Sequence, residues 1–295
     1  MARQTLADAT ADATRVLERA GIPAEASGRD ASRLGRSVLG WDEARWLAHR
    51  GDPAPPEFAA RLAPLVDRRR RREPLAYILG EREVYGRPFR VTRDVLIPRP
   101  ETELLIEEAL TARVRSPGSS DPGSGSLHAL DLGTGSGCLA VTLACECPQA
   151  HVLGVDASVP ALEIARQNAI RHGVQDRVGF RHGHLLDETE GRFDLVLSNP
   201  PYVPETDRAS LDPEVGVYEP ATALFAGADG LDVIRAVVPA SAQALHPGGW
   251  LILEFGFGQA DAVVSLIRHT PGLTLRRIRE DLQDIPRVAV AERTE

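Results

Sequence analysis

Short apolar segments alternate with helical stretches over the last two thirds of the sequence. The apolar segments are LHALDL, HVLGVDA, VGFRHG, FDLVLSN and WLILEFG, and the stretches between them include CLAVTLACE and PALEIARQNAIRHG. Strands that alternate with helices are typical of a parallel sheet covered by helices on both faces. The carboxyl ends of such strands meet at one edge, where open α/β sheets bind their ligands. We therefore expect an α/β domain with its site at that edge.

The residues ahead of this region are typical of a small helical domain. Apolar residues recur at helical spacing from Leu6 to Ala20, and Gly21-Ile22-Pro23 ends the pattern. Further helices are expected over residues 24–39, 41–49 and 56–72. Between Tyr77 and Ile97, β-branched and aromatic residues with Gly80 and Gly86 predict a β-hairpin.

These patterns divide the chain into three parts. We expect a helical domain over residues 1–74, a β-hairpin linker over residues 75–97 and the α/β domain over residues 98–295. The segment SPGSSDPGSGS, residues 116–126, is of low complexity and is expected to form a mobile surface loop.

The charge balance bears on the partners. With 34 Lys and Arg against 42 Asp and Glu, the net charge is -8, which disfavours general binding to nucleic acids. No apolar stretch is long enough to span a bilayer and the N-terminus has no apolar leader, so a cytoplasmic location is expected. The run Arg68 to Arg72 can contact a nucleic acid or an acidic partner, but we favour a solvated face at a helix C-terminus.

Three cysteines, Cys138, Cys145 and Cys147, lie in one expected helical segment. Their odd number and their spacing fit neither a disulfide framework nor a zinc site. We interpret them as buried structural thiols, since free cysteine is often buried.

A glycine-rich turn follows the first strand of the α/β region. The turn is Asp131-Leu132-Gly133-Thr134-Gly135-Ser136-Gly137, and residues without Cβ atoms let a ligand approach the backbone amides. A tight turn without a ligand is the alternative. About twenty residues on, Asp156 ends the next strand, where a carboxylate can accept both hydroxyl protons of an adenosine ribose; it can also cap the following helix. The two features together favour an adenosyl ligand.

The segment Ser198-Asn199-Pro200-Pro201-Tyr202 falls at the end of the fourth strand. Asn-Pro-Pro alone can be a turn, but that leaves Asn199 and Tyr202 without a role. If the Asn199 side-chain oxygen and the Pro200 carbonyl accept the two N–H hydrogens of a planar amide or amine, they stabilise the positive charge that grows on nitrogen during attack. The prolines fix φ, and Tyr202 can pack on the flat nucleophile and align it with a methyl group.

These motifs resemble those of S-adenosylmethionine-dependent N-methyltransferases. Asn-Pro-Pro-Tyr is shared by glutamine N5-methyltransferases and amino-group DNA methyltransferases. The remainder, from about residue 73 to the end, resembles the PrmC/HemK family, which methylates peptide chain release factors. The matching segments are Glu73 to Gly80, Leu96 to Glu103, Glu219-Pro220, Gly227 to Leu231, Pro247-Gly248-Gly249, Glu254-Phe255-Gly256 with Gln259, and Asp281 with Arg287.

The resemblance implies a fold and a reaction. It implies a Rossmann-like, seven-stranded class I methyltransferase domain ending in an antiparallel strand, behind a helical domain that helps to hold the release factor and a hairpin linker. The substrate that it implies is the glutamine of a Gly-Gly-Gln loop in class-1 release factors, methylated at N5 by S-adenosylmethionine. Neither DNA nor a membrane is an expected partner, and a monomer is expected.

The resemblance also implies roles for individual residues. The cofactor would be bound by Gly133, Thr134, Gly135, Ser136, Gly137, Asp156 and Asn199. The glutamine amide would be held by Asn199, Pro200, Pro201 and Tyr202, of which Asn199, Pro200 and Tyr202 would be catalytic.

The resemblance implies two further cofactor-binding residues, His184 and Leu185, of which His184 departs from the family pattern. His184 stands where the family usually has an acid near the adenine, and Leu185 stands where a side chain packs on the base. His182 and His184 suggest a metal, but they lack an evident third ligand, and we expect no metal. The C-terminal DLQDIPRVAV also lacks the family's usual glycine between Asp281 and Arg287, which predicts a local change in that loop.

Three alternatives to release factor methylation remain open at this point. A methyltransferase for glutamine in a ribosomal protein shares the core but differs ahead of it. A DNA adenine methyltransferase normally carries a basic target-reading region, and no such insertion follows Tyr202. A non-catalytic module that docks on release factors is disfavoured by the intact motifs.

Overall fold

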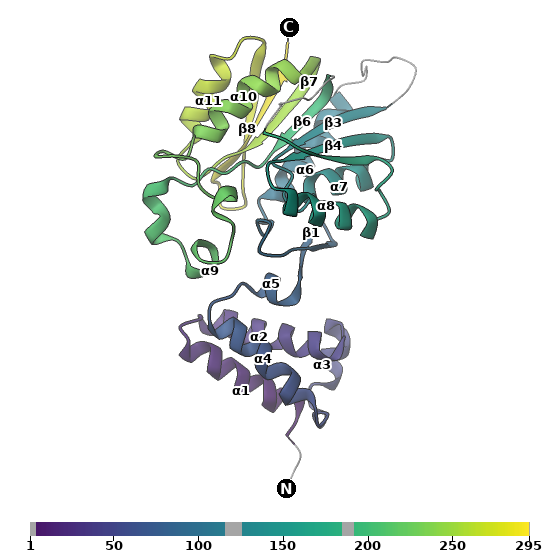
Figure 1. The fold of residues 1–295 in the computed structure, drawn as a ribbon, viewed down its shortest axis with the longest axis vertical. Coiled ribbons are helices and arrows are strands. Elements are labelled where there is room, and N and C mark those ends of the chain that lie inside the picture. The colour runs from purple at the N-terminus through teal and green to yellow at the C-terminus, as the bar shows by residue number, and fades with distance from the viewer. Residues whose placement is uncertain (1–3, 116–125, 185–191, 295) are drawn as a thin grey trace. The chain divides into compact units, whose positions relative to one another are not determined.

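The structure is a computed structural model that describes residues 4–115, 126–184 and 192–294 (Figure 1). The chain forms two compact units, which are considered separately. The helical unit comprises Met1–Gly80 and Asp212–Tyr218, and the sheet unit comprises Glu81–Leu211 and Glu219–Glu295. Segment 116–126 was expected to be mobile; residues 116–125 of it lie outside the described residues.

The helical unit confirms the expected N-terminal helices to within two residues at each end. Its helices are α1 (Leu6–Arg19), α2 (Ala24–Leu39), α3 (Glu43–His49), α4 (Phe58–Arg70), α5 (Leu75–Leu79) and α9 (Pro213–Gly216). Thr5 begins α1 with a capping box to Asp8, and the Asp42 carboxylate begins α3 by accepting the Arg45 N–H. The core between the helices includes the buried side chains of Leu17, Leu34, Trp46, Phe58 and Leu62.

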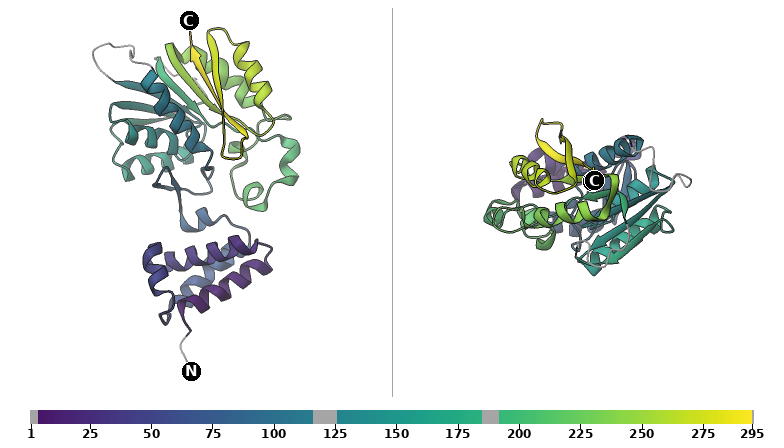
Figure 2. Two further views of the ribbon diagram at one scale, coloured as in Figure 1. Left: turned by 180° about the vertical axis from the view of Figure 1, so that it is seen from behind. Right: turned by 90° about the horizontal axis from the view of Figure 1, so that it is seen from above.

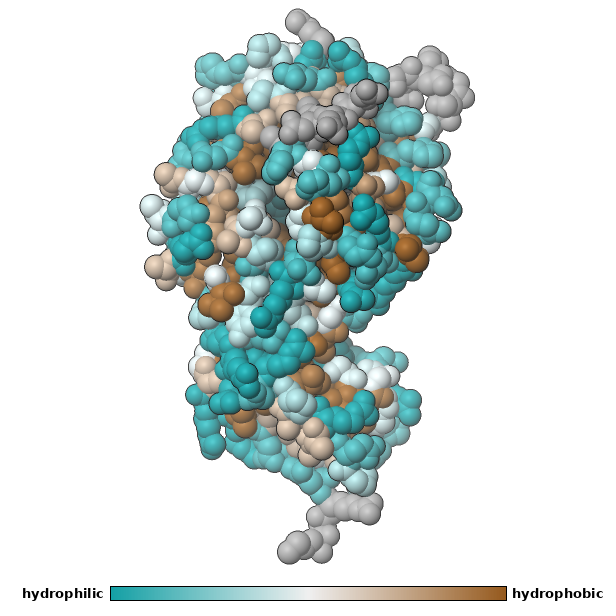
Figure 3. Space-filling model, viewed as in Figure 1, coloured by the Kyte–Doolittle hydropathy of each residue, from teal (hydrophilic) through white to brown (hydrophobic). Residues whose placement is uncertain are grey.

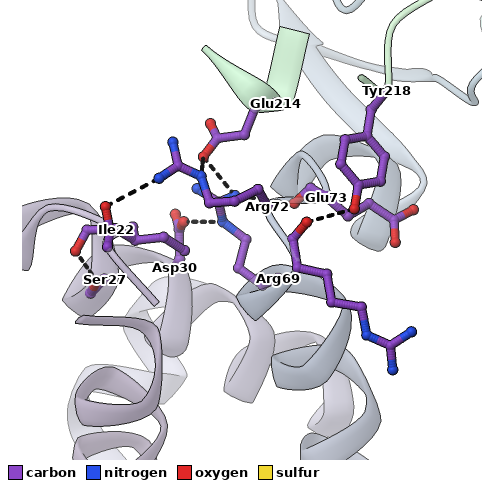
Figure 4. A network of polar contacts seen from close by, with 10 residues as sticks. Ile22, Ser27, Asp30, Arg69, Arg72, Glu73, Glu214 and Tyr218 are labelled. Carbon is purple, nitrogen blue, oxygen red and sulfur yellow. Dashed lines mark hydrogen bonds and ion pairs between the residues drawn. The ribbon is translucent and has the colours of Figure 1, made fainter. Parts of the chain in front are cut away.

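The expectation that the arginine run forms a solvated face is wrong for two of its five members, Arg69 and Arg72, whose side chains are largely buried. Arg69 is only 5% exposed; its guanidinium pairs with Asp30 at 2.6 Å and with Glu214 at 2.9 Å (Figure 4). Arg72 pairs with the same Glu214 at 2.9 Å. Arg68 forms two hydrogen bonds to Glu73, but its side chain stays 42% exposed.

The other two arginines of the run, Arg70 and Arg71, remain exposed and pair with Asp67 on their own helix. The run therefore combines solvated charges with internal ion pairs. The internal pairs hold segment 212–218, and the Tyr218 hydroxyl adds a bond to the Arg71 carbonyl at 2.6 Å (Figure 4).

The expected hairpin is present at the start of the sheet unit. Strands β1 (Glu81–Val84) and β2 (Arg87–Arg90) pair antiparallel, with Glu81 opposite Arg90. Tyr85 and Gly86 both have positive φ at the turn, as a two-residue hairpin turn of this hand requires. The linker proposed over residues 75–97 thus consists of α5, in the helical unit, and this hairpin, in the sheet unit.

Within the described residues, seven strands form the main sheet, as expected. They are β3 (Leu127–Leu132), β4 (Ala150–Asp156), β5 (Val178–His182), β6 (Phe193–Ser198), β7 (Leu245–Glu254), β8 (Leu273–Glu280) and β9 (Pro286–Arg293). Their order is β5-β4-β3-β6-β7-β9-β8; β3 to β7 are parallel and β9 runs antiparallel to both neighbours. Chain order reverses between β3 and β6, so the switch point lies there.

Helices cover both faces of this sheet (Figure 1 and Figure 2). One face packs against α6 (Thr102–Arg115) and α7 (Cys138–Glu146), with α8 (Val159–Arg171) beside α7; the other packs against α10 (Asp232–Ala244) and α11 (Ala260–Arg268). Alternate strand residues serve the two cores: Ala129 lies in the first and Leu130 in the second. Short helices η1 (Glu205–Ser210) and η2 (Ala221–Ala223) lie in the connection after β6.

Cys138 and Cys147 are buried, as expected, whereas Cys145 is half-buried. Large exposed hydrophobic side chains such as Phe257 and Leu282 are few, and hydrophobic residues on the face in view form separate small areas (Figure 3). In the part of the chain that the structure describes, no helix combines the length and apolar character needed to cross a membrane.

Candidate active site

The glycine turn after β3 requires glycine for reasons of its own backbone. Gly133, Gly135 and Gly137 have φ values of +74°, +53° and +77°, a region that other residues rarely adopt. A Cβ on Gly137 would also lie 3.0 Å from the Ala165 Cβ of α8. The N–H groups of Gly133 and Thr134 both donate to the Val155 carbonyl, so the turn is bound to the end of β4. The turn is thus preorganised before any ligand arrives.

Asp131 lies under this turn. Its Oδ2 accepts bonds from the Thr134 hydroxyl at 2.6 Å and the Ala140 N–H at 3.2 Å, while its Oδ1 has no partner among the described residues. Complete burial raises the pKa of this carboxyl to about 7, against the two hydrogen bonds, which lower it. The turn therefore contains a buried acceptor that is free for a ligand bringing a donor.

Asp156 stands at the end of β4, beside the turn. Its two oxygens accept the Gly135 N–H and the Ser158 N–H, each at 2.8 Å. The N-cap of α8 is Ser158, whose hydroxyl accepts the Ala161 N–H, so Asp156 is not the cap residue. The structure thus brings Asp156 and the glycine turn together at the carboxyl edge of the sheet.

Asn168 supports the turn from the other side, and no sequence motif predicts this role. Its fully buried amide donates to the Ser136 carbonyl at 2.8 Å and to the Arg90 carbonyl at 3.0 Å, while its oxygen accepts the Arg90 N–H at 2.7 Å. One α8 side chain therefore links the glycine turn to the last residue of β2.

Asn199 directly follows β6, across the switch point from the glycine turn. Its side-chain nitrogen donates to the Thr102 hydroxyl at the start of α6, at 3.2 Å. Ser198 anchors the end of the strand because its hydroxyl donates to the Leu132 carbonyl of β3 at 2.8 Å. The bond to Thr102 leaves the Asn199 oxygen available as an acceptor.

Tyr202 is held at both its backbone and its hydroxyl. Gln259 donates to the Tyr202 carbonyl at 2.9 Å, and the phenol donates to Glu254 at 3.2 Å. Gly230 is needed here, since a Cβ at this position would lie 2.2 Å from the Tyr202 carbonyl oxygen. Two of the segments that carry the family resemblance therefore serve to place Tyr202.

Glu219 joins two further segments that carry the family resemblance. This buried carboxylate accepts the Ile97 N–H and pairs with Arg99. Burial raises the pKa of Glu219, and Arg99 opposes that shift. Leu96 to Glu103, which ends at the start of α6, is thereby fixed to the connection after β6.

The structure gives little support for the expected cofactor-binding roles of His184 and Leu185. His184 is exposed just beyond β5, whose carboxyl end shares the edge with the glycine turn, and Leu185 lies outside the described residues. His182 contacts the Ala157 carbonyl. No cluster of three or more metal-binding side chains occurs within residues 4–115, 126–184 and 192–294.

Fold and site together define a Rossmann-like α/β methyltransferase: a glycine turn, an acid and Asn-Pro-Pro-Tyr follow β3, β4 and β6 at one edge of the sheet. Residues 120–212 match the methyltransferase small domain family, and residues 8–80 match the PrmC N-terminal domain.

Relatives that align with most of this chain identify the family within this class of enzymes. A release factor glutamine methyltransferase of Cereibacter sphaeroides is 43% identical, over 97% of this chain and 97% of its own. Proteins of the same name are 46% identical in Geobacter sulfurreducens (79% of this chain, 78% of theirs) and 41% in Deinococcus radiodurans (98% of both). The chain belongs to the release factor glutamine methyltransferase family.

Proposed function

We propose that this enzyme transfers a methyl group from S-adenosylmethionine to the side-chain nitrogen, N5, of the glutamine in the Gly-Gly-Gln motif of class-1 peptide chain release factors. The observation that carries the proposal is the orientation of Asn199. Its amide nitrogen is bound to Thr102, which leaves its oxygen as an acceptor at the carboxyl edge of the sheet.

The chemical difficulty is that an amide nitrogen is planar and weakly nucleophilic. Asn199 and the Pro200 carbonyl would accept its two N–H hydrogens and stabilise the charge that develops as it forms its new bond to carbon. In the described part of the chain, no backbone N–H donates to the Pro200 carbonyl. Pro200 and Pro201 restrict the backbone, and the Tyr202 ring, fixed through its hydroxyl, would pack on the amide plane. In this mechanism, the enzyme accelerates the reaction mainly by positioning the substrate amide against the methyl group.

The residues around the glycine turn suit the cofactor. S-adenosylmethionine, when bound, supplies an electrophilic methyl group on a cationic sulfur. Gly133 to Gly137 would hold its polar groups against the backbone, and Asp156 would accept its ribose hydroxyls. The unpartnered Oδ1 of Asp131 offers a further buried acceptor at the same turn. We propose no role for His184.

The helical unit is proposed to contribute to holding the release factor, in agreement with its match to the PrmC N-terminal domain. We further propose that the enzyme acts as a monomer, and in the cytoplasm, where release factors work.

The test is mass spectrometry of a purified class-1 release factor after incubation with the enzyme and S-adenosylmethionine. A gain of one methylene on the Gly-Gly-Gln glutamine is expected, and none on a factor in which that glutamine is replaced by alanine. An adenine-containing duplex and a ribosomal protein fraction serve as parallel substrates. Methylation of either one, with none on the release factor, would overturn the proposal.

A further inference from the structure

Two turns at the carboxyl edge of the sheet each carry an exposed hydrophobic side chain. Of the large hydrophobic side chains that the structure describes, Leu282 and Phe257 are the most exposed; Leu282 is fully exposed and Phe257 is 77% exposed. Phe257 follows β7, and Leu282 lies in the turn between β8 and β9. A single hydrophobic side chain on a surface needs no explanation, but two beside a substrate site indicate a surface for a partner.

The pairing of the strands brings the two turns to one place. β7 and β9 are antiparallel neighbours, with Glu254 opposite Val288, and the Phe255 N–H donates to the Arg287 carbonyl at 2.9 Å. The turn after β7 and the turn before β9 therefore leave the sheet at the same edge. Since β7 is parallel to β6, this is also the edge at which Asn199 lies.

The turn that carries Phe257 is fixed to Tyr202. The Gly256 N–H donates to the Gln259 side-chain oxygen at 2.8 Å, and the nitrogen of the same side chain donates to the Tyr202 carbonyl at 2.9 Å. A Cβ on Gly256 would lie 3.0 Å from the Tyr202 ring, so the backbone of the turn packs against that ring. Phe257 is thus the next residue after one that contacts the ring assigned to the substrate amide.

The turn that carries Leu282 is also held by several hydrogen bonds. One oxygen of the Asp281 carboxylate accepts the N–H groups of Gln283 and Ile285, at 2.8 and 3.1 Å. The other oxygen accepts a bond from the Arg287 guanidinium at 2.9 Å. Both turns therefore hold a hydrophobic side chain in water at a fixed place, which lowers the entropy cost of binding a partner there.

We infer that Phe257 and Leu282 form a docking surface for the release factor loop that carries the glutamine, with the Phe257 ring packed on the glycines beside that glutamine. This inference rests on the proposed function, because it names what binds next to the substrate amide. Glycine has no side chain, so its peptide planes can approach a flat ring closely. A glutamine amide held on Tyr202 brings the adjoining glycines to the turn after β7, where Phe257 stands. Leu282, on the neighbouring turn, contacts apolar groups farther along the same loop.

This position predicts a particular kinetic effect. Phe257 and Leu282 lie outside the group of residues assigned to the reacting amide and to the cofactor. Their contacts with the release factor are the same before and during methyl transfer, so losing them should raise KM and leave kcat unchanged.

The first experiment measures kcat and KM for a purified class-1 release factor with Phe257→Ala, Phe257→Tyr and Leu282→Ala. We expect KM to rise about 10-fold in Phe257→Ala and about 3- to 10-fold in Leu282→Ala, because each loses a hydrophobic contact that is buried on binding. Phe257→Tyr keeps the ring and should keep the wild-type KM. In all three variants, kcat and the affinity for S-adenosylmethionine measured by calorimetry should stay at the wild-type values.

Ile170→Ala is the matched control. Ile170 is 64% exposed near the end of α8, which returns the chain from β4 to the amino end of β5, so it lies at the opposite edge of the sheet. Its KM should equal that of the wild type. A wild-type KM in Phe257→Ala, an equal rise in Ile170→Ala, or a loss in Phe257→Ala that falls on kcat alone would overturn the inference.

The second experiment locates the contact without relying on turnover. Phe257→p-benzoylphenylalanine and, as its control, Ile170→p-benzoylphenylalanine introduce a photo-crosslinking side chain. After irradiation with the release factor, the first variant should crosslink to the Gly-Gly-Gln segment, as mapped by mass spectrometry, and the second should not. If the wild type methylates the factor but position 257 crosslinks elsewhere or not at all, the inference alone is wrong. If the wild type does not methylate the factor, the proposed function is wrong, and the inference falls with it.

Discussion

The carboxylate of Asp156 accepts the backbone N–H of Gly135 at 2.8 Å, so the end of β4 and the turn after β3 form one rigid element. Asp156→Ala removes both this support and the proposed ribose acceptor. We expect cofactor binding to weaken by about 1 to 3 kcal/mol, the cost of leaving polar partners unpaired. Calorimetric titration with S-adenosylmethionine measures this change. Asp176→Ala, at an exposed position before β5, should leave the affinity unchanged; an equal loss there would contradict the assignment.

Asn199→Ala should abolish methyl transfer while leaving the fold and most of the cofactor affinity intact. The lost oxygen acts chiefly on charge that appears only in the transition state, so the loss falls on kcat. Single-turnover transfer of a labelled methyl group, followed beside circular dichroism and cofactor titration, checks the three expectations together. Near-normal transfer by the folded variant would exclude Asn199 as the acceptor.

The sequence predicted the fold because local patterns are strong in this chain. The alternation of apolar segments and helices predicted the parallel strands, and apolar residues at helical spacing from Leu6 to Ala20 predicted the first helix. The place of residues 212–218 could not be predicted. Those residues belong to the helical unit through ion pairs of Glu214 with Arg69 and Arg72, which lie about 140 positions earlier in the chain.

The candidate site was foreseen only where residues follow strands directly. Asp156 and Asn199 end or follow parallel strands, so topology alone placed them at one edge. Thr102 and Asn168 come from helices, and their roles depend on which way those helices turn. Glu254 does end a strand, but its hydroxyl partner, Tyr202, is 52 residues away in sequence. Such pairings arise from tertiary packing rather than from a local pattern.

Arg69 should be far more important for stability than its neighbours in the run. Its replacement by alanine leaves Asp30 and Glu214 without their buried partner, at a cost of about 3 to 5 kcal/mol, whereas Arg70→Ala, on the exposed side of α4, should cost less than about 1 kcal/mol. Urea unfolding followed by the fluorescence of Trp46, in the core of the helical unit, reports the difference. Similar losses in both variants would mean that the pairs to Asp30 and Glu214 contribute little.

The raised pKa of Asp131 predicts how the stability of the protein depends on pH. Its pKa is about 7 in the folded protein and near the ordinary 3.8 when unfolded, so between these values the folded state binds more protons. Its contribution therefore lowers the free energy of unfolding as the pH rises through this window, by up to about 4 kcal/mol in all. Asp131→Asn keeps an acceptor oxygen for Thr134 and removes the titration.

Urea unfolding of the wild type and of Asp131→Asn at several values between about pH 5 and pH 8 tests this. The variant should lose less stability than the wild type as the pH rises, because the wild type alone must ionise a buried carboxyl. Asp176→Asn, at an exposed carboxylate, should follow the wild-type curve. Parallel curves for the wild type and Asp131→Asn would mean that Asp131 ionises in the folded protein as readily as in the unfolded chain. Bound cofactor should reduce the wild-type slope if it brings a cationic donor to the free Asp131 oxygen, since that contact would favour the ionised form.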